Sequence, residues 1–178
     1  MKILDTERLS LRRLAADDAT FIRRLVNDPS WLRFIGDRGV RNDDDARRYL
    51  DNGPIAMYAA MGFGLYLVET RDGRAPIGIC GFVKRETLAD VDLGFAFLPE
   101  FRGRSYAFEA ASATMAFGAD ALGLKRVVAI TAPDNRPSIR LLERLGFRLE
   151  RRLRLGDDAD LLCLYAAATG PATTAGTS

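Results

Sequence analysis

The feature that most constrains this chain is a strand–loop–helix segment at residues 90–122. An apolar strand leads into a short basic loop that contains Gly103, and a helix of small residues begins at Ser105. The first backbone N–H groups of a helix have no partner inside the helix, and the helix dipole makes that end partly positive. Backbone groups can therefore bind a phosphate there. We expect Arg102, Gly103, Arg104 and Ser105 to contribute to an anion site.

A second segment, residues 126–147, places another strand before another helix. A buried strand ends at Pro133, and Asn135 opens a short helix. Pro137 lies in the first turn, where its missing N–H costs nothing. Three leucines form an apolar stripe along this helix, and Gly146 is predicted to end it as a C-terminal cap.

These two segments resemble motifs of the GNAT superfamily of acyl-CoA N-acyltransferases, and most closely those of its Rim-type branch of ribosomal-protein N-terminal acetyltransferases. The similarity extends over residues 6–167. The segment 135–147, which reads Asn-x-x-Ser and then Leu-Gly-Phe, is the more specific part. The segment Arg102–Ala107 is similar to the family's pyrophosphate loop, with Ser105 where the family usually has glycine.

The order of elements predicts an α+β fold. Helices gather near the start of the chain and stand singly between later strands, which indicates a mixed, mostly antiparallel central sheet of about seven strands flanked by helices. The resemblance implies a splayed strand pair that forms an acyl-CoA wedge, in which 91–98 diverges from 127–132. The length of 178 residues fits one domain, residues 1–168. Residues 169–178 are small and polar and are predicted to be a disordered tail.

Local signals predict the remaining elements. Asp17 or Asp18 caps a first helix that stops near residue 27, and Asn42 caps a second. Residues 31–41 have the composition of a loop. Strands are expected at 9–14, 65–70, 76–84, 147–155 and 160–167, with the last two forming an antiparallel pair.

The absence of histidine restricts the chemistry. Ser–His and Cys–His nucleophile pairs and zinc sites that use histidine are excluded. Cys80 and Cys163 lie far apart without the spacing of metal ligands, and Cys80 sits in an apolar strand where a buried core thiol is expected. We predict no metal site. A general base must be a carboxylate, an unusual Tyr or Lys, or water.

Charge and hydropathy exclude two classes of partner. A net charge of +2 lacks the large basic field of a nucleic-acid binder. The apolar run at residues 55–68 is shorter than the ~20 residues that a membrane helix needs, so no membrane segment is predicted. The start of the chain has no secretory leader, and the cysteines are dispersed, so we expect a cytoplasmic protein. A Rossmann dinucleotide site is excluded because no Gly-x-Gly-x-x-Gly follows a first strand.

The resemblance implies that acetyl-CoA is the co-substrate. Its pantetheine arm would pair with exposed backbone at Phe97 and Leu98, in the manner of an added strand. Asn135 would bind a pantetheine amide, although it can also simply cap its helix. The diphosphate would lie on the loop formed by Arg102, Gly103, Arg104, Ser105, Tyr106 and Ala107.

Two features of this loop stay open at the level of sequence. Arg102 and Arg104 are expected to add charge-assisted contacts to the diphosphate, and the alternative is a solvated basic loop. We expect Ser105 to lie in the helical region, where its hydroxyl can bind phosphate. In the left-handed region a serine would be strained by roughly 1 kcal/mol or more.

Candidate catalytic residues follow from the need for an unprotonated amine. Asp92 is the first candidate base, with a solvent-facing strand carboxylate as the alternative, and Glu69 is the second, with an edge charge as its alternative. The N–H of Phe97 or Leu98 would bind the oxyanion. Many GNAT enzymes place a tyrosine where this chain has Leu142, and the resemblance implies that Ser138 points toward the sulfur instead.

The leading functional hypothesis is an acetyl-CoA-dependent N-acetyltransferase that acts by direct transfer in a ternary complex. An α-amine titrates near ~7.7–8.0 and is partly neutral at cellular pH, which favours a protein N-terminus as acceptor. The alternatives are a small amine, such as an aminoglycoside or polyamine, and a non-catalytic acyl-CoA-binding module. A homodimer joined through the last strands is compatible with such folds. The acceptor pocket is expected from residues 31–40, 58–63 and 156–159.

Overall fold

The computed structural model describes residues 1–170; most of the predicted tail, residues 171–178, lies outside the described part. The strands are β1 (Lys2–Asp5), β2 (Leu9–Arg13), β3 (Leu65–Thr70), β4 (Pro76–Val83), β5 (Asp92–Phe97), β6 (Arg126–Thr131), β7 (Arg148–Leu153) and β8 (Leu162–Ala168). The helices are α1 (Ala19–Val26), α2 (Pro29–Phe34), α3 (Asp43–Leu50), α4 (Ala56–Met61), α5 (Tyr106–Asp120) and α6 (Arg136–Arg144).

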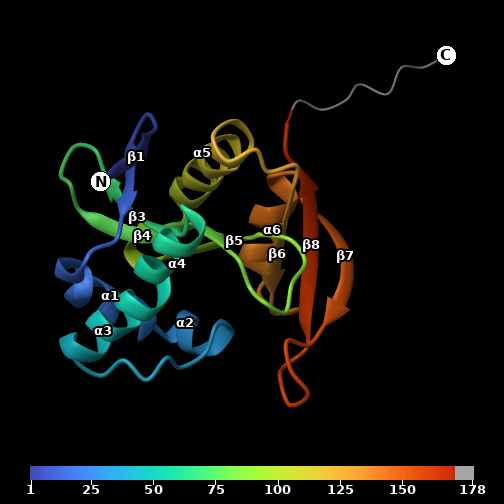
Figure 1. Ribbon diagram of the computed structural model, residues 1–178, viewed down its shortest axis with the longest axis horizontal. Coiled ribbons are helices and arrows are strands. Elements are labelled where there is room, and N and C mark those ends of the chain that lie inside the picture. The colour runs from blue at the N-terminus through green and yellow to red at the C-terminus, as the bar shows by residue number, and fades with distance from the viewer. Residues whose placement is uncertain (171–178) are drawn as a thin grey trace.

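The strands form one eight-stranded sheet in the order β1-β2-β3-β4-β5-β6-β8-β7 (Figure 1). Neighbouring strands are antiparallel throughout, except for the parallel pair β5 and β6. The predicted α+β fold and the antiparallel pair at the end of the chain are confirmed. The sheet has one strand more than the approximate prediction because Lys2–Asp5 pairs with β2.

The two faces of the sheet are covered by different helices. α5 lies on one side of β3–β5, and α1–α3 lie on the other (Figure 1). Successive side chains of a strand point to opposite faces. Tyr66 and Val68 accordingly join the apolar cluster that includes Ala110 of α5, whereas Leu67 joins the cluster built on α1 and α3.

Small residues let α5 approach the sheet closely. Ala110, Ala111 and Thr114 are fully buried on one face of this helix. At Gly118 an added Cβ would come within 2.6 Å of the Phe82 ring, so no larger residue fits without rearrangement. This close packing holds the first turn of α5 beside the end of β5, where the anion loop begins.

Local capping signals account for two of the helices. The Asn42 side chain accepts a hydrogen bond from the Asp45 N–H at 2.8 Å, which confirms Asn42 as the cap of α3. At the end of α6, the N–H of Phe147 donates to the Leu142 carbonyl at 2.9 Å, and Gly146 has φ +90°. This is the predicted glycine cap.

The expectation of a loop over residues 31–41 is wrong in its first part. α2 spans Pro29–Phe34, and the Asp28 carboxylate caps it by accepting from the Ser30 N–H at 3.1 Å. Asp-Pro is a helix start signal as well as a stop signal, because proline suits the first helical position. Within residues 1–170, no helix is long and apolar enough to cross a bilayer.

Candidate active site

The sheet opens between β5 and β6. These strands share a single registered pair, Asp92 opposite Val128, and the Val128 N–H donates to the Val91 carbonyl at 3.0 Å. Beyond this point the strands diverge, which confirms the predicted splayed pair (Figure 1). A strand edge without a neighbour leaves N–H and C=O groups available to a ligand.

The alternation of the β5 backbone determines which groups face this gap. The Leu98 N–H donates to the Ile77 carbonyl of β4 at 2.9 Å, so it is not available to an oxyanion. Val91 bonds toward β6, and residues two apart along a strand direct their backbone groups to the same side. Phe95 and Phe97 therefore direct their backbone groups into the gap, and of the two predicted oxyanion donors only Phe97 stays available.

The loop after β5 has the backbone geometry of an anion site. Gly103 has φ +73° and Ser105 has φ +60°, with Arg104 between them outside the positive-φ region. Alternation of this kind turns successive N–H groups toward one side. The N–H groups of Tyr106 and Ala107, in the first turn of α5, have no backbone partner among the described residues. The predicted loop thus presents a set of N–H donors at a helix N-terminus.

The conformation of Ser105 corrects the expectation that it lies in the helical region. Its φ of +60° and ψ of +15° are left-handed, and its side chain makes no capping hydrogen bond. A serine in this conformation carries strain on the order of 1 kcal/mol. The glycine usual in the resembled motif would adopt the same conformation freely.

The Arg102 side chain turns inward rather than toward the anion loop. Its guanidinium donates to the Phe97 carbonyl at 2.8 and 3.0 Å, to the Asp28 carboxylate at 2.9 Å and to the Ser30 hydroxyl at 3.0 Å. These bonds tie Arg102 to β5 and α2 while its side chain stays 43% exposed, and its predicted contact with a diphosphate stays a prediction. Arg104 is exposed, with its carbonyl accepting from Arg8 at 3.1 Å.

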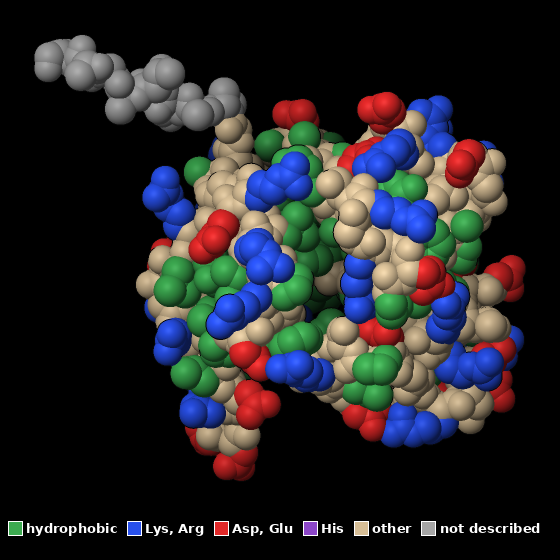
Figure 2. All heavy atoms as spheres, turned by 180° about the vertical axis from the view of Figure 1, so that it is seen from behind, with side chains coloured by type: hydrophobic (Ala, Val, Ile, Leu, Met, Phe, Trp, Pro, Cys, Tyr) green, Lys and Arg blue, Asp and Glu red, His purple; other side chains and the backbone are tan. Residues whose placement is uncertain are grey.

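A cavity of about 670 Å³ lies where the sheet opens. The face of the molecule in Figure 2 is hollowed between two lobes, with hydrophobic side chains inside the hollow and Lys and Arg side chains at its rim. β5, β6 and α6 form one wall of the cavity, and the chain from α2 to α4 forms the opposite wall. Residues from the two walls include Asp92, Phe95, Thr131, Asn135, Ser138 and Leu142 on the first, and Trp31, Phe34, Arg38, Tyr49 and Met57 on the second.

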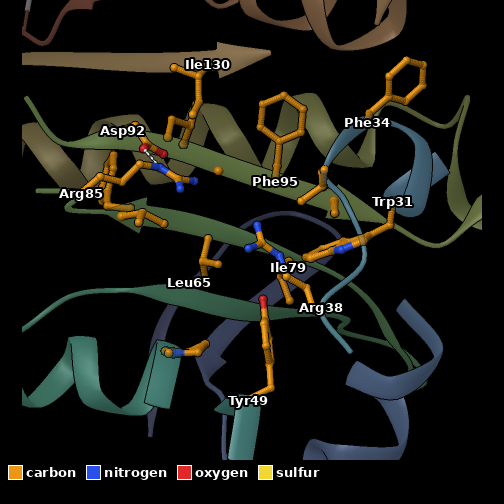
Figure 3. Close-up of a pocket in the computed structure, with 18 of the residues that line it drawn as sticks. Trp31, Phe34, Arg38, Tyr49, Leu65, Ile79, Arg85, Asp92, Phe95 and Ile130 are labelled. Carbon is orange, nitrogen blue, oxygen red and sulfur yellow. Dashed lines mark hydrogen bonds and ion pairs between the residues drawn. The ribbon is translucent and has the colours of Figure 1, made fainter. Parts of the chain in front are cut away.

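Asp92 begins β5 and lines this cavity (Figure 3). It is 2% exposed, so the alternative of a solvent-facing strand carboxylate is wrong. The Arg85 Nε donates to its Oδ2 at 2.6 Å, whereas its Oδ1 accepts no hydrogen bond among residues 1–170. Burial raises the pKa of Asp92, and the charge of Arg85 opposes that rise without cancelling it.

Ser138 and Asn135 lie at the start of α6, and both line the cavity. The Asn135 side chain accepts from the Ser138 N–H at 3.4 Å, so Asn135 is the helix cap as well as a cavity residue. Leu142, one turn further on, is 1% exposed and also borders the cavity. The structure thus brings the hydroxyl of Ser138 to the same cavity as the Asp92 carboxylate.

Glu69 is not brought to this cavity. It stands near the end of β3, is 5% exposed, and forms ion pairs with Arg12 at 3.4 Å and with Arg74 at 3.7 Å. Its strand lines the cavity through Leu65, at the opposite end. The Cys80 thiol is fully buried, its pKa is raised by burial to about 12, and it lies 3.4 Å from the Thr114 hydroxyl, so the predicted core thiol is confirmed.

The wall formed by the chain from α2 to α4, called the acceptor-side wall below, contains one of the three segments predicted to form the acceptor pocket. Residues 31–40 contribute to the cavity, whereas 58–63 and 156–159 do not. The Tyr58 hydroxyl donates to the Leu65 carbonyl and accepts from the Leu14 N–H at 3.1 Å, so this side chain is used inside the fold. Sequence reasoning missed Tyr49 and Arg85 as cavity residues. A signal for Arg85 existed, because the hairpin that pairs Val83 with Asp92 keeps Arg85, two residues after Val83, within reach of that carboxylate.

In residues 1–170 no group of three or more His, Cys, Asp or Glu side chains is arranged to hold a metal ion. The groups that line the cavity include carboxylates, hydroxyls, amides, arginines and an open strand edge. Such a site can bind an extended amide-containing ligand and move a proton at an amine.

Comparisons with known proteins agree with this geometry. Residues 8–148 match the family described as the acetyltransferase (GNAT) domain. The chain is 30% identical over 153 residues to the uncharacterized N-acetyltransferase YoaA of Bacillus subtilis (strain 168), covering 85% of this chain and 86% of that protein. The crystal structure of an acetyltransferase from Agrobacterium tumefaciens str. C58 is 26% identical, with a TM-score of 0.78 and 92% of each chain covered.

The fold is also shared with RimL, a ribosomal L7/L12 alpha-N-protein acetyltransferase solved in complex with coenzyme A. The TM-score is 0.81 at 20% identity, and the likeness covers 95% of this chain and 98% of that one. At this identity the likeness concerns the fold alone. The family match over most of the chain, together with the relative at 30% identity, identifies this chain as a member of the GNAT family of acyl-CoA-dependent acetyltransferases.

Proposed function

We propose that this chain transfers the acetyl group of acetyl-CoA to a primary amine by direct attack in a ternary complex. The observation that carries the proposal is that one cavity contains the open edge of β5, the Asp92 carboxylate and the Ser138 hydroxyl. The amine nitrogen attacks the thioester carbonyl carbon, the C–N bond forms, and the C–S bond breaks. The proton of the amine passes to Asp92, and the leaving thiolate is stabilised by Ser138.

The backbone supplies the binding site for the co-substrate. The free edge of β5, at the backbone of Phe95 and the N–H of Phe97, suits the amides of a pantetheine arm, because a strand edge can pair with any extended chain that carries amides. The left-handed residues Gly103 and Ser105 and the first turn of α5 suit a diphosphate. The Phe97 N–H is the proposed oxyanion donor.

Asp92 is the proposed base because its environment suits the task. Its raised pKa brings it closer to that of an amine than an ordinary carboxyl would be, and a better-matched base takes a proton more readily. The unpaired Oδ1 leaves a lone pair for the proton while Arg85 fixes the carboxylate through Oδ2. Ser138 lines the same wall of the cavity from α6, where its hydroxyl can donate to the sulfur.

The charges of the cavity favour an α-amine acceptor over a polycationic small molecule. Three arginines line it, Arg38, Arg48 and Arg85, against the two carboxylates Asp45 and Asp92. Both carboxylates already form ion pairs with arginines. A polyamine or aminoglycoside would meet an excess of like charge, whereas a protein N-terminus brings a single amine.

The test is thiol release from acetyl-CoA, followed with a thiol-reactive dye against N-terminal peptides, polyamines and aminoglycosides, with calorimetric CoA binding in parallel. Turnover that Asp92→Asn and Ser138→Ala reduce, with CoA affinity unchanged, supports the proposal. CoA binding without turnover on any acceptor favours the non-catalytic acyl-CoA-binding module. If the protein does not bind CoA, the assignment of the loop at Gly103 to the diphosphate is wrong.

A further inference from the structure

Arg38 is a cavity arginine that has no carboxylate partner in the described part of the chain. Arg85 is bound to Asp92, and Arg48 to Asp45, whereas Arg38 forms no ion pair and no hydrogen bond in residues 1–170. The acid next to Arg38 in sequence, Asp37, is occupied by Arg41 at 2.9 Å. Arg38 therefore brings an uncompensated positive charge to the acceptor-side wall.

The hydroxyl of Tyr49 faces the same part of the cavity. Tyr49 extends from α3 with its oxygen toward Arg38 and Ile79 (Figure 3). The hydroxyl has no hydrogen-bond partner within residues 1–170. Burial raises the pKa of Tyr49, and the charges of Arg38 and Arg85 act against this rise. A cation and a neutral O–H donor thus stand together without an acceptor.

Apolar side chains contribute to the cavity wall beside this pair. Trp31, Phe34, Leu65 and Ile79 line the cavity around Arg38 and Tyr49 (Figure 3). Arg38 is itself exposed, so solvent screens part of its charge, and binding of an anion would depend on direct contact with the guanidinium. Arg85 and Asp92 occupy the other end of the view, where β5 diverges from β6.

We propose that the acceptor carries a carboxylate, which Arg38 and Tyr49 bind while its amine lies at Asp92. This inference rests on the proposed function and specifies the substrate class of the same site. A guanidinium matches a carboxylate in geometry and charge and forms the stronger, charge-assisted kind of hydrogen bond. The apolar wall accommodates a hydrocarbon side chain of the acceptor.

Two kinds of acceptor carry both an amine and a carboxylate. A free amino acid has a carboxylate next to its amine, and a peptide with Asp or Glu near its N-terminus has one a few bonds further away. The experiment compares matched acceptors that differ in that group alone: leucine with leucinamide, and an amidated peptide beginning Ala-Glu with one beginning Ala-Gln. Spermidine serves as the cationic comparison.

The readout is kcat/KM for each acceptor at saturating acetyl-CoA. We expect the wild type to prefer the carboxylate member of at least one pair by roughly ten- to a hundredfold, and we expect spermidine to be the poorest acceptor. Leucinamide has the less basic amine and would by that property be the faster acceptor, so a preference for leucine reports binding of the carboxylate. The pair that shows the preference identifies the source.

Variants assign the preference to the proposed residue. Arg38→Gln should bring the ratio within a pair close to one, and Arg38→Lys should keep part of it. Arg47→Gln is the matched control, because Arg47 is an exposed arginine of α3 that pairs with Asp44 and does not line the cavity. CoA affinity, measured by calorimetry, should be unchanged in all three variants.

The inference is overturned if the wild type does not distinguish the members of either pair, or if Arg38→Gln keeps the full preference. Failure of the proposed function gives a different result, namely CoA binding without transfer to any amine. In that case titration of N-acetyl-leucine and N-acetyl-leucinamide into the CoA complex decides the same question, since a carboxylate site would still bind the first more tightly, and equal binding would contradict it.

Discussion

β5 is held differently along its two edges. Along β4 it is paired from Phe97, opposite Gly78, to Asp92, opposite Val83, whereas along β6 it meets its neighbour only at Asp92. The first edge forms part of a continuous antiparallel ladder, and the second is open to ligands over most of its length. The backbone of the same strand therefore stabilises the sheet on one side and offers a binding edge on the other.

The two strand carboxylates follow this difference. Glu69 and Asp92 are both buried, and each is paired with arginine. Glu69 belongs to the continuous part of the sheet, where its ion pairs join neighbouring segments, while Asp92 stands where the sheet opens. Burial and an arginine partner are thus common to both carboxylates, and the proposed role of Asp92 rests on its position at the open edge.

The largest effect is expected from Asp92→Asn. Loss of a general base commonly lowers the rate by about 10²–10⁴-fold, so kcat should fall in that range while the CoA dissociation constant stays within about twofold. Glu69→Gln is the matched control and should leave kcat within a few-fold of wild type. Steady-state kinetics with calorimetry checks both, and equal losses of kcat in the two variants would remove the distinction between the carboxylates.

The pH dependence of activity and of stability also tests the role of Asp92. Asp92 must be ionised to accept a proton, and its pKa is raised by burial, so activity should decline on acidification at a pH above the usual carboxyl range. Because the folded pKa exceeds the unfolded one, the ionised carboxylate costs stability above the folded pKa, and this cost disappears as pH falls below the unfolded pKa. Asp92→Asn should therefore lose the acid limb of the rate profile and show no lower Tm at neutral pH.

In contrast to Asp92→Asn, a substitution at Glu69 is expected to destabilise the protein. Glu69→Gln leaves Arg12 and Arg74 without their charged partner and should lower the free energy of unfolding by about 1–3 kcal/mol. Urea denaturation measures this change, with Asp92→Asn in parallel. A Glu69→Gln protein as stable as wild type would mean that these ion pairs contribute nothing, as is often found for pairs that reach solvent.

Ser138→Ala is expected to have a smaller kinetic effect, a loss of roughly tenfold in kcat, because loss of one hydrogen bond to a developing charge is on the order of 1.4 kcal/mol. The cap of α6 is the Asn135 side chain, so the Tm should change little. The kcat of Ser138→Ala is compared with that of the wild type at saturating acetyl-CoA. An unchanged kcat would exclude Ser138 as the group that stabilises the thiolate.

The smallest effect is expected at the loop that follows the open edge. Ser105→Gly removes the strain of a left-handed serine and should raise the free energy of unfolding by up to about 1 kcal/mol, less the entropy that glycine gains in the unfolded chain. CoA affinity should stay within a few-fold of wild type, because backbone donors carry the binding. A large loss of affinity would instead show that the serine hydroxyl contacts the diphosphate.

Local signals predicted much of this fold. Asn42, Asn135 and Gly146 determine where helices start or end through contacts within a few residues, and each was identified from sequence. Lys2–Asp5 was missed because a four-residue edge strand depends on its neighbour β2 rather than on its own pattern. α2 was missed because Asp28-Pro29 ends one helix and begins another.

The candidate site residues likewise divide into those placed by local sequence signals and those placed by contacts between distant segments. Asp92, Asn135 and Ser138 could be placed at the cavity because they lie on or beside the motif strands and helix. The direction of the Arg102 side chain could not, because it is set by Asp28, 74 residues away in sequence. Tyr49 could not be placed either, since its position beside Arg38 depends on how α3 packs against the sheet, which is a tertiary contact.

The single rung between β5 and β6 also bears on how long the molecule survives in a cell. Hydrogen bonding is continuous from β1 to β5 and again from β6 to β7, so a strand-like ligand in the gap would complete the sheet. Because the gap exists only in the folded protein, such a ligand binds the native state alone. A ligand that binds only the native state stabilises it by mass action. Turnover of the protein by proteases should therefore slow when acetyl-CoA is abundant and quicken when it is scarce, which couples the abundance of the enzyme to the supply of its own substrate.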